Sequence, residues 1–523
     1  MSSQSRSEIA SRDDQNAATS AARRWQSWRL DLWALAGILI VAMIAMAISL
    51  TRFSTEYDEG VYWQSLRAMA QGRPLYSAVF GSQPPGFLLG VYPGYRLFGQ
   101  SIVAGRVTIA LYALVGILAT YVIGRALGGR WVGALAAGLL ALNPRYLQEA
   151  TTLQAEIPSL ALSLVGIALM AVVMQRTHPR PQRLLLIAAA GVAFGVAIMM
   201  KLLAVVALVP AVLLLAEPLV QEMRERQASR QTFLNSARDI GLLLGGVLLA
   251  CVVILAPFGP QWGALYEQVI GFHLVARGTS SGVGPLANLL LLPDITWIVA
   301  ALGCAVAVWR RMWVALPLLA WLLASVLVLI VQRPLFDPHA LILAPPLALL
   351  AALGGVAALE WARSSWNIRA KELLLMAGTL VALGATLLVG LWFDARQLSV
   401  DSAYDGGRRA QMVQALQDHA IPAGLVVTDD QYVAALAGRN TPPELVDTSL
   451  VRIATGSLTT GEVERIIGRE NVRVVLFATD RLYRLPGLRS WVEANFRPIK
   501  SFGSGETLYI RNAPLSLRGG AGS

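Results

Sequence analysis

The chain has 523 residues, of which 55% are hydrophobic and only 14% are charged, and its net charge is +11. Soluble domains carry roughly 25% charged residues, so this composition excludes an ordinary soluble protein and indicates one that crosses a membrane several times. The basic residues cluster in short loops between apolar runs, where they set membrane topology, and we therefore expect no nucleic-acid partner.

The first 30 residues are polar and rich in Ser and Ala, and we expect them to be disordered in the cytoplasm. A membrane helix needs about 20 mostly apolar residues. Eleven later runs approach this requirement, although two of them are short: Leu32–Leu50, Ile102–Gly124, Trp131–Leu142, Ile157–Met174, Leu184–Met200, Leu202–Ala216, Ile240–Pro257, Ile295–Trp309, Met312–Val331, His339–Leu359 and Leu373–Phe393.

The distribution of Lys and Arg predicts which loops face the cytoplasm. If the N-terminus is cytoplasmic and the runs alternate, the cytoplasmic segments carry 19 Lys and Arg residues, whereas the short outer loops carry 7. This asymmetry follows the positive-inside rule. An odd number of spans then places the part of the chain after Phe393 outside the cytoplasmic membrane.

Two segments are long enough to form structure outside the bilayer. In the first outer loop, residues 51–101, we expect two helices along the membrane surface, Gly60–Ala70 and Phe87–Phe98. Residues 394–523 alternate helical and strand patterns, which predicts a small α/β domain. Its expected elements are Ala410–His419, Leu425–Thr428, Gly461–Arg469, Val472–Ala478, Leu488–Phe496 and a hairpin of Pro498–Phe502 with Thr507–Arg511. The expected architecture is therefore an all-α polytopic membrane bundle, residues 31–393, followed by an extracytoplasmic α/β domain.

An acidic stretch follows directly on the first apolar run, where residues 54–63 read STEYDEGVYW. Three carboxylates, Glu56, Asp58 and Glu59, therefore lie at the mouth of a membrane helix and are flanked by aromatic residues. Charge there is unfavourable unless it faces water, a partner or a substrate. The stretch is either a solvated end of the helix or part of a reaction site.

This order of features is similar to that of the GT-C superfamily of membrane glycosyltransferases. An acidic pair opens the first outer loop, and aromatic residues, Pro84-Pro85, a long bundle and an outer C-terminal domain follow. The resemblance covers roughly residues 30–360 and is closest to bacterial relatives of the protein O-mannosyltransferases and of the lipid A aminoarabinose transferases. It implies a hexosyl- or pentosyltransferase whose donor is a polyprenyl-phosphate-linked sugar. The acceptor would be a protein, a lipid or a glycan on the outer face of the cytoplasmic membrane.

The resemblance also implies roles for three acidic residues. Asp58 matches the family's acidic residue at the start of the first outer loop, which implies a general base for an inverting transfer. Glu59 would hold Asp58 or bind the acceptor, and Glu156, at the start of the fourth run, would position Asp58. We assign no cofactor. A divalent cation shared by Asp58 and Glu156 stays open, because members of the family differ on this point.

Other matched positions imply contacts to the donor phosphate. These are Lys201, His339, Arg106 and Gln83, although Gln83 stands where many relatives have a basic residue. Each also has an ordinary structural explanation, such as a Lys that reaches the interface or a His that caps a helix. For the acceptor we expect Tyr57 and Tyr62, with His273 and Arg277 in a flexible loop, residues 258–294, that would act as a lid.

Two other functions compete with the transferase. A secondary transporter would bind its substrate near the middle of the bilayer and is built from repeats, whereas here the ionisable residues gather at one edge. A non-catalytic scaffold or assembly subunit would keep the fold but scatter the candidate residues. The transferase predicts that Asp58, Glu156, Lys201 and His339 converge on one cavity.

Overall fold

The computed structural model describes residues 29, 31–53, 56–175, 178–226, 229–279, 295–363, 377, 381, 388, 406–420, 424–503 and 505–512. Eight helices within these residues are long and apolar enough to cross a membrane, and the chain is a multi-pass membrane protein. They are Asp31–Ser49, Ile102–Gly128, Glu156–Gln175, Arg180–Met200, Leu202–Arg224, Arg230–Ala276, Trp313–Val331 and Asp337–Trp361.

The expected count of eleven spans is not confirmed. Two of the eleven runs form helices below that length, namely α5 (Arg130–Ala141), with 12 residues, and α14 (Ile295–Trp309), with 15. The last run, Leu373–Phe393, lies outside the described residues apart from three isolated positions. The expected boundary between bundle and C-terminal domain, near residue 394, stays a prediction for the same reason.

The bundle is built outward from α4 (Ile102–Gly128) in two directions. On one side α7 (Glu156–Gln175), α8 (Arg180–Met200) and α10 (Arg230–Leu255) follow as successive neighbours. On the other side lie α5, α16 (Ala344–Arg363) and α14, while α9 (Leu208–Arg224) packs against α15 (Leu316–Val331). Small residues permit this close approach, because a Cβ on Gly191 of α8 would lie 2.2 Å from the carbonyl oxygen of Leu243 in α10.

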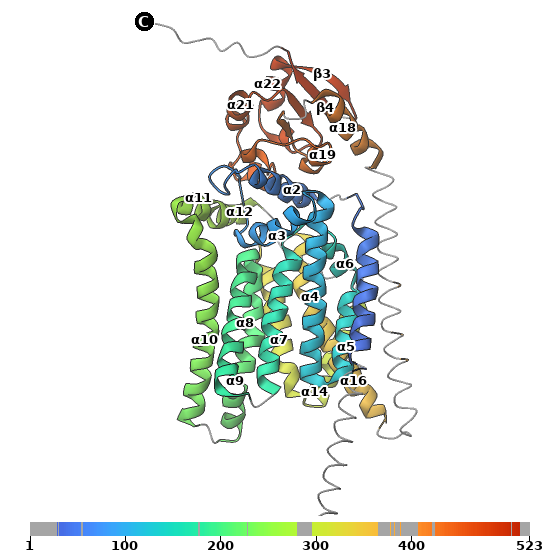
Figure 1. Ribbon diagram of the computed structural model, residues 1–523, viewed down its shortest axis with the longest axis vertical. Helices are drawn as coiled ribbons and strands as arrows, with labels where there is room; N and C mark the ends of the chain where they lie inside the picture. Colours follow the sequence, from blue (N-terminus) through green and yellow to red (C-terminus); the bar gives the residue numbers. More distant parts are fainter. Residues whose placement is uncertain are drawn as a thin grey trace, which may run out of the picture.

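Short helices gather at one end of the bundle (Figure 1). The expected surface helices of the first outer loop are confirmed as α2 (Tyr57–Ala70) and α3 (Gly86–Leu97). Asp58 and Glu59 stand in the first turn of α2, where the helix dipole favours acidic residues. The other short helices at this end are α6 (Pro144–Ala150), α11 (Trp262–Tyr266), the π-helical turn η3 (Glu267–Gly271), α12 (Phe272–Ala276) and the 3-10 turn η4 (Arg277–Thr279).

The loop expected to act as a flexible lid, residues 258–294, is helical in its first half. Residues 256–279 continue from α10 as an unbroken series of short helical segments, beginning with the 3-10 turn η2 (Ala256–Gln261). Its buried side chains include Phe258, Leu265, Val269 and Phe272, so apolar packing holds the segment against the rest of this end. The polar, glycine-rich residues that suggested mobility, 280–294, lie outside the described residues.

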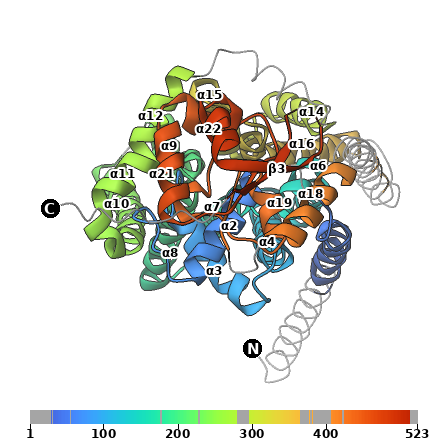
Figure 2. The same ribbon diagram turned by 90° about the horizontal axis from the view of Figure 1, so that it is seen from above.

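The C-terminal α/β domain covers the same end of the bundle (Figures 1 and 2). Its four-stranded sheet has the order β1-β2-β4-β3, with β1 (Val426–Thr428) parallel to β2 (Val474–Phe477) and the remaining pairs antiparallel. The expected hairpin is confirmed as β3 (Phe496–Ser501) and β4 (Thr507–Arg511). The expected helices are confirmed as α18 (Gly406–His419), α21 (Thr460–Arg469) and α22 (Leu488–Asn495).

No element was predicted between β1 and α21, yet this segment is structured and contacts the bundle end. It contains α19 (Gln431–Leu436), the 3-10 turn η7 (Pro443–Leu445) and α20 (Leu450–Ala454). α19 lies so close to α2 that a Cβ on Gly60 would be 2.4 Å from the backbone nitrogen of Tyr432. Arg67 of α2 donates hydrogen bonds to Asn440 Oδ1 at 2.7 Å and to the Gly438 carbonyl at 3.2 Å. The C-terminal domain is therefore fixed directly on the first outer loop.

Candidate active site

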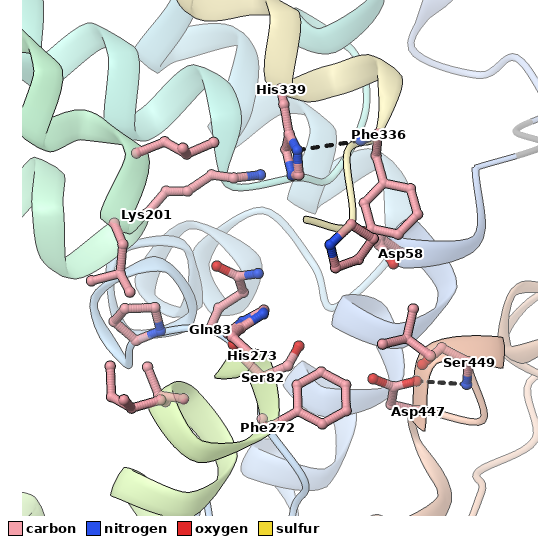
Figure 3. Close-up of a pocket in the computed structure, with 18 of the residues that line it drawn as sticks. Asp58, Ser82, Gln83, Lys201, Phe272, His273, Phe336, His339, Asp447 and Ser449 are labelled. Carbon is pink, nitrogen blue, oxygen red and sulfur yellow. Dashed lines mark hydrogen bonds between the residues drawn. The ribbon is translucent and has the colours of Figure 1, made fainter. Parts of the chain in front are cut away.

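A cavity of about 460 Å³ lies between the bundle, the short helices and the C-terminal domain. Its lining includes the polar residues Asp58, Gln83, Lys201, His273, Arg277, His339 and Asp447 (Figure 3). These residues come from six separate stretches of the chain, and only the fold brings them together. A concave site with a few convergent polar groups among apolar walls is the usual form of a small-molecule or substrate site.

Asp58 faces this cavity from the first turn of α2. The residue is exposed and lines the cavity. Burial of the site raises the pKa of Asp58 to about 7, and the nearby Asp447 and Glu156 add to this effect while Lys201 opposes it. A carboxylate with a pKa near neutrality is suited to accept a proton from a substrate hydroxyl or amine.

Lys201 reaches the cavity from the residue that ends α8. This residue is extended, with φ −155° and ψ 125°, and the break between α8 and the 3-10 turn η1 (Leu202–Ala207) turns the side chain inward. Its ammonium forms a buried ion pair with Glu156 at the start of α7. Glu156 therefore holds Lys201, and its charge also contributes to the raised pKa of Asp58.

His339 enters the cavity from the 3-10 turn η6 (Asp337–Leu343), which precedes α16. The backbone N–H of Phe336 donates a hydrogen bond of 3.3 Å to Nδ1 of His339. In the neutral ring the proton therefore resides on Nε2, which is a hydrogen-bond donor. Lys201 and His339 also line a second, smaller hollow together with Glu156, so the three residues form one polar cluster.

The loop between α2 and α3 is held at the cavity by the short helices. Nε2 of His273 lies 2.8 Å from the carbonyl oxygen of Ser82, and Gln268 bonds both the Tyr76 carbonyl and the Gly81 N–H. Gln83 follows Ser82 and lines the cavity. His273 and Arg277 also line the cavity. The contact with Ser82 holds the His273 ring against this loop.

Two candidate residues, Glu59 of the acidic stretch and Arg106 of α4, do not line the cavity. Glu59 is fully buried and forms a two-pronged ion pair with Arg106, with both N–O distances 2.8 Å. It also accepts a hydrogen bond from the Leu153 N–H, while Arg106 donates to the carbonyls of Leu50 and Arg52. This placement does not fit the catalytic role expected for Glu59 or the phosphate contact expected for Arg106. Both side chains are buried, and their polar atoms bond to other protein groups.

The two tyrosines of the acidic stretch have different surroundings. Tyr62 lines the cavity and packs edge to face on Phe87, with the ring centres 4.7 Å apart. Tyr57 does not line the cavity. Its hydroxyl donates to Oδ1 of Asp447 at 3.2 Å and accepts from the Thr448 N–H at 2.6 Å. The expected acceptor contact of Tyr57 is thus replaced by a contact between α2 and the C-terminal domain.

Asp447 is a charged cavity residue that sequence reasoning missed. It lies in an irregular segment after η7, and no motif or helical spacing singles it out. The nearest signal in the sequence is the run Asp447-Thr448-Ser449, in which the Ser449 N–H donates to Oδ1 of Asp447 at 2.8 Å. Only the docking of the C-terminal domain brings this carboxylate to Asp58.

The arrangement does not fit a metal centre. Within the described part of the chain, no three His, Cys, Asp or Glu side chains are grouped so that they could hold a metal ion. Glu156, one of the two residues considered for a shared cation, is neutralised by the Lys201 ammonium. We therefore derive no step through a metal.

Comparison with solved structures identifies the architecture. The structure of ArnT from Cupriavidus metallidurans bound to undecaprenyl phosphate aligns with a TM-score of 0.63 at 16% identity, covering 91% of this chain and 97% of that one. The fold is that of the GT-C membrane glycosyltransferases. Other GT-C structures agree. Archaeal oligosaccharyltransferase AglB from Archaeoglobus fulgidus, in complex with an inhibitory peptide and a dolichol-phosphate, gives a TM-score of 0.54 at 14% identity, covering 92% of this chain and 75% of that one.

The match to a sequence family covers a smaller part of the chain than the structural matches do. Residues 82–244 match the family described as dolichyl-phosphate-mannose-protein mannosyltransferase. The matched segment begins just before Gln83 and includes Glu156 and Lys201. A search of curated protein sequences finds no match.

Proposed function

We propose that the protein transfers a sugar from a polyprenyl-phosphate-linked donor to an acceptor on the outer face of the cytoplasmic membrane, with inversion at the anomeric carbon. The observation that carries this proposal is the presence of Asp58, Lys201 and His339 in the lining of one cavity. A scaffold has no need for that convergence. The donor class is supported by the GT-C fold and by the undecaprenyl phosphate and dolichol-phosphate named for two structures that share it.

In the proposed reaction Asp58 acts as the general base. Its carboxylate takes the proton from an acceptor hydroxyl or amine as that atom attacks the anomeric carbon. The bond between the anomeric carbon and the phosphate oxygen breaks, and the polyprenyl phosphate leaves with the electron pair. Because the leaving group is already a phosphate, no strong acid is required.

Lys201 and His339 are the proposed phosphate contacts. Lys201 supplies a cation and His339 supplies an Nε2 N–H donor, and both lie in the same cavity as Asp58. Donors fixed in a water-poor site stabilise developing charge more strongly than they do in water. Gln83 and Arg277 line the cavity as further polar contacts to the donor or acceptor.

The proposed orientation places the cavity outside the cytoplasm. The first outer loop and the C-terminal domain lie at one end of the bundle, which is what an odd number of spans requires (Figure 1). The excess of Lys and Arg in the opposite loops supports assigning that end to the outer side of the inner membrane.

A complementation experiment tests the function. A strain lacking the gene is supplied with the wild-type chain or with Asp58→Asn, and its surface glycans, lipids and proteins are compared by mass spectrometry. We expect one sugar-mass increment that appears with the wild type and is absent with the variant, at equal protein levels in the membrane. Identical masses with and without the wild-type gene would overturn the transferase. Full restoration by Asp58→Asn would overturn only the base assignment.

A further inference from the structure

Asp447 is a buried carboxylate that the proposed reaction does not use. Only 6% of the residue is exposed, and it lines the main cavity. Among the described residues no cation forms an ion pair with its side chain. The charge of the neighbouring Arg452 acts on Asp447, but its guanidinium donates to the backbone carbonyl of Asp447 at 2.7 Å. A buried carboxylate that no cation contacts directly is unfavourable unless a ligand or a set of hydrogen bonds satisfies it.

The orientation of Asp447 is fixed through one oxygen. Oδ1 accepts hydrogen bonds from the Ser449 N–H at 2.8 Å and the Tyr57 hydroxyl at 3.2 Å. Within the described residues Oδ2 has no such bond to the protein, and in the view of Figure 3 it points toward the cavity. The side chain is therefore held in place with one acceptor oxygen left for a ligand.

The cavity has an acidic side and a basic side. Asp58 and Asp447 lie together on one side, and Lys201 lies across from them (Figure 3). The two carboxylates are close enough for the charge of Asp447 to act on Asp58. If the phosphate binds on the side of Lys201, as proposed above, the acidic side remains for the acceptor.

We propose that Asp447 is an acceptor-binding residue, and that the acceptor is a carbohydrate that presents one donor group to Asp58 and a neighbouring one to Asp447. This inference rests on the proposed function. Two carboxylates on one side of the cavity can each accept a hydrogen bond from the same ligand. A sugar ring offers such a pair of donors, because it carries hydroxyl or amino groups on adjacent carbons. A Ser or Thr side chain offers a single hydroxyl. The aromatic rings of Tyr62, Phe80 and Phe272 line the same cavity and supply apolar faces for a ring.

The test compares Asp447→Asn with a matched control, Arg67→Ala. Arg67 also joins α2 to the C-terminal domain, through Asn440 and Gly438, but it does not line the cavity. Each variant is expressed in the strain lacking the gene, sugar transfer is quantified by mass, and binding of undecaprenyl phosphate to the purified full chain is measured by native mass spectrometry. Asp447→Glu, which keeps the carboxylate, serves as the rescue variant.

We expect Asp447→Asn to reduce transfer roughly ten- to hundredfold, the effect of losing a hydrogen bond to a charged group. Binding of undecaprenyl phosphate should stay unchanged, Arg67→Ala should retain transfer, and Asp447→Glu should recover part of it. Transfer at the wild-type level in Asp447→Asn would overturn the role of Asp447. If Asp447→Asn and Arg67→Ala lost transfer and stability to the same extent, Asp447 would serve only to dock the C-terminal domain onto the bundle.

The linkage of the product tests the acceptor class. The added sugar should be attached to a glycan, and its attachment to a Ser or Thr side chain would overturn the carbohydrate acceptor. A wild-type chain that adds no sugar at all would instead refute the proposed function, so the two failures are distinguishable.

Discussion

Glu59 and Arg106 form a buried, two-pronged ion pair that joins the start of α2 to the first turns of α4. The side chains are 0% and 3% exposed, respectively, so neither charge has access to water if its partner is lost. Arg106 also donates to the hydroxyl of Tyr432 at 3.2 Å, which extends the network into the C-terminal domain. Glu59 directly follows Asp58 in the first turn of α2, so the pair ties this turn to α4.

Removing one partner of this pair should destabilise the protein strongly. Arg106→Met leaves Glu59 charged and buried, and we expect a loss of about 3–5 kcal/mol in the free energy of unfolding. Thermal unfolding of the purified protein in detergent measures this loss. Glu59→Gln combined with Arg106→Met should recover much of it, and equal stability of the double and single variants would contradict the account.

The raised pKa of Asp58 predicts the pH dependence of transfer. A general base works in its deprotonated form, and burial raises the pKa of Asp58 to about 7. The rate should therefore increase as the pH rises through about 7 and level off above it. Initial rates in membrane vesicles across this range measure the profile. Because the charge of Asp447 contributes to the raised pKa, Asp447→Asn should move the midpoint to lower pH.

The same shift predicts the stability of Asp58→Asn. A folded-state pKa above the ordinary value of 3.8 means that ionised Asp58 opposes folding, and this cost grows as the pH rises toward about 7. At pH 8 the Asn variant should therefore be at least as stable as the wild type while transfer is lost. A variant that is clearly less stable at pH 8 would show that Asp58 has a structural role.

Lys201 should be needed for binding of the lipid phosphate. Lys201→Met removes the cation from the cavity, and we expect at least about a tenfold weaker affinity for undecaprenyl phosphate, a change of about 1.4 kcal/mol. Lys500→Met, on the outward side of the C-terminal domain, is the control and should bind normally. Because Lys201→Met leaves Glu156 unpaired, the combination with Glu156→Gln separates stability from binding: it should restore stability and not affinity.

Gly60 tests the contact between α2 and α19. A methyl group there would lie 2.4 Å from the Tyr432 backbone nitrogen, so Gly60→Ala should cost about 1–3 kcal/mol and loosen the C-terminal domain. Limited proteolysis detects such loosening. Gly468→Ala in α21, where nothing lies within 4 Å of the new atom, is the control and should be neutral or slightly stabilising.

The sequence was sufficient for features that depend on local pattern. Apolar runs identified the long helices and the buried strands β1 and β2, and the glycine-containing turn between two short strand patterns identified the hairpin of β3 and β4. The resemblance to a family directed attention to Asp58, Lys201 and His339, and the fold brings all three to one cavity.

Features that depend on contacts between distant parts of the chain could not be predicted from local sequence patterns. Glu59 and Asp58 are adjacent acids with similar surroundings in sequence, but α2 turns one to the cavity and the other to Arg106, 47 positions away. Asp447 lies 389 positions after Asp58, in an irregular segment without periodicity. Its role depends on how two domains dock, which local pattern does not encode.

The position of Tyr432 has a consequence for how the protein is made. Its ring packs against Phe53 and Trp63, with centres 5.1 and 5.9 Å away, and its hydroxyl completes the surroundings of Arg106. The ribosome synthesises this residue more than three hundred positions after the membrane helix it contacts. A chain cut short before α19 would therefore lack one wall of the cavity and the Tyr432 contact, and it should insert into the membrane without activity.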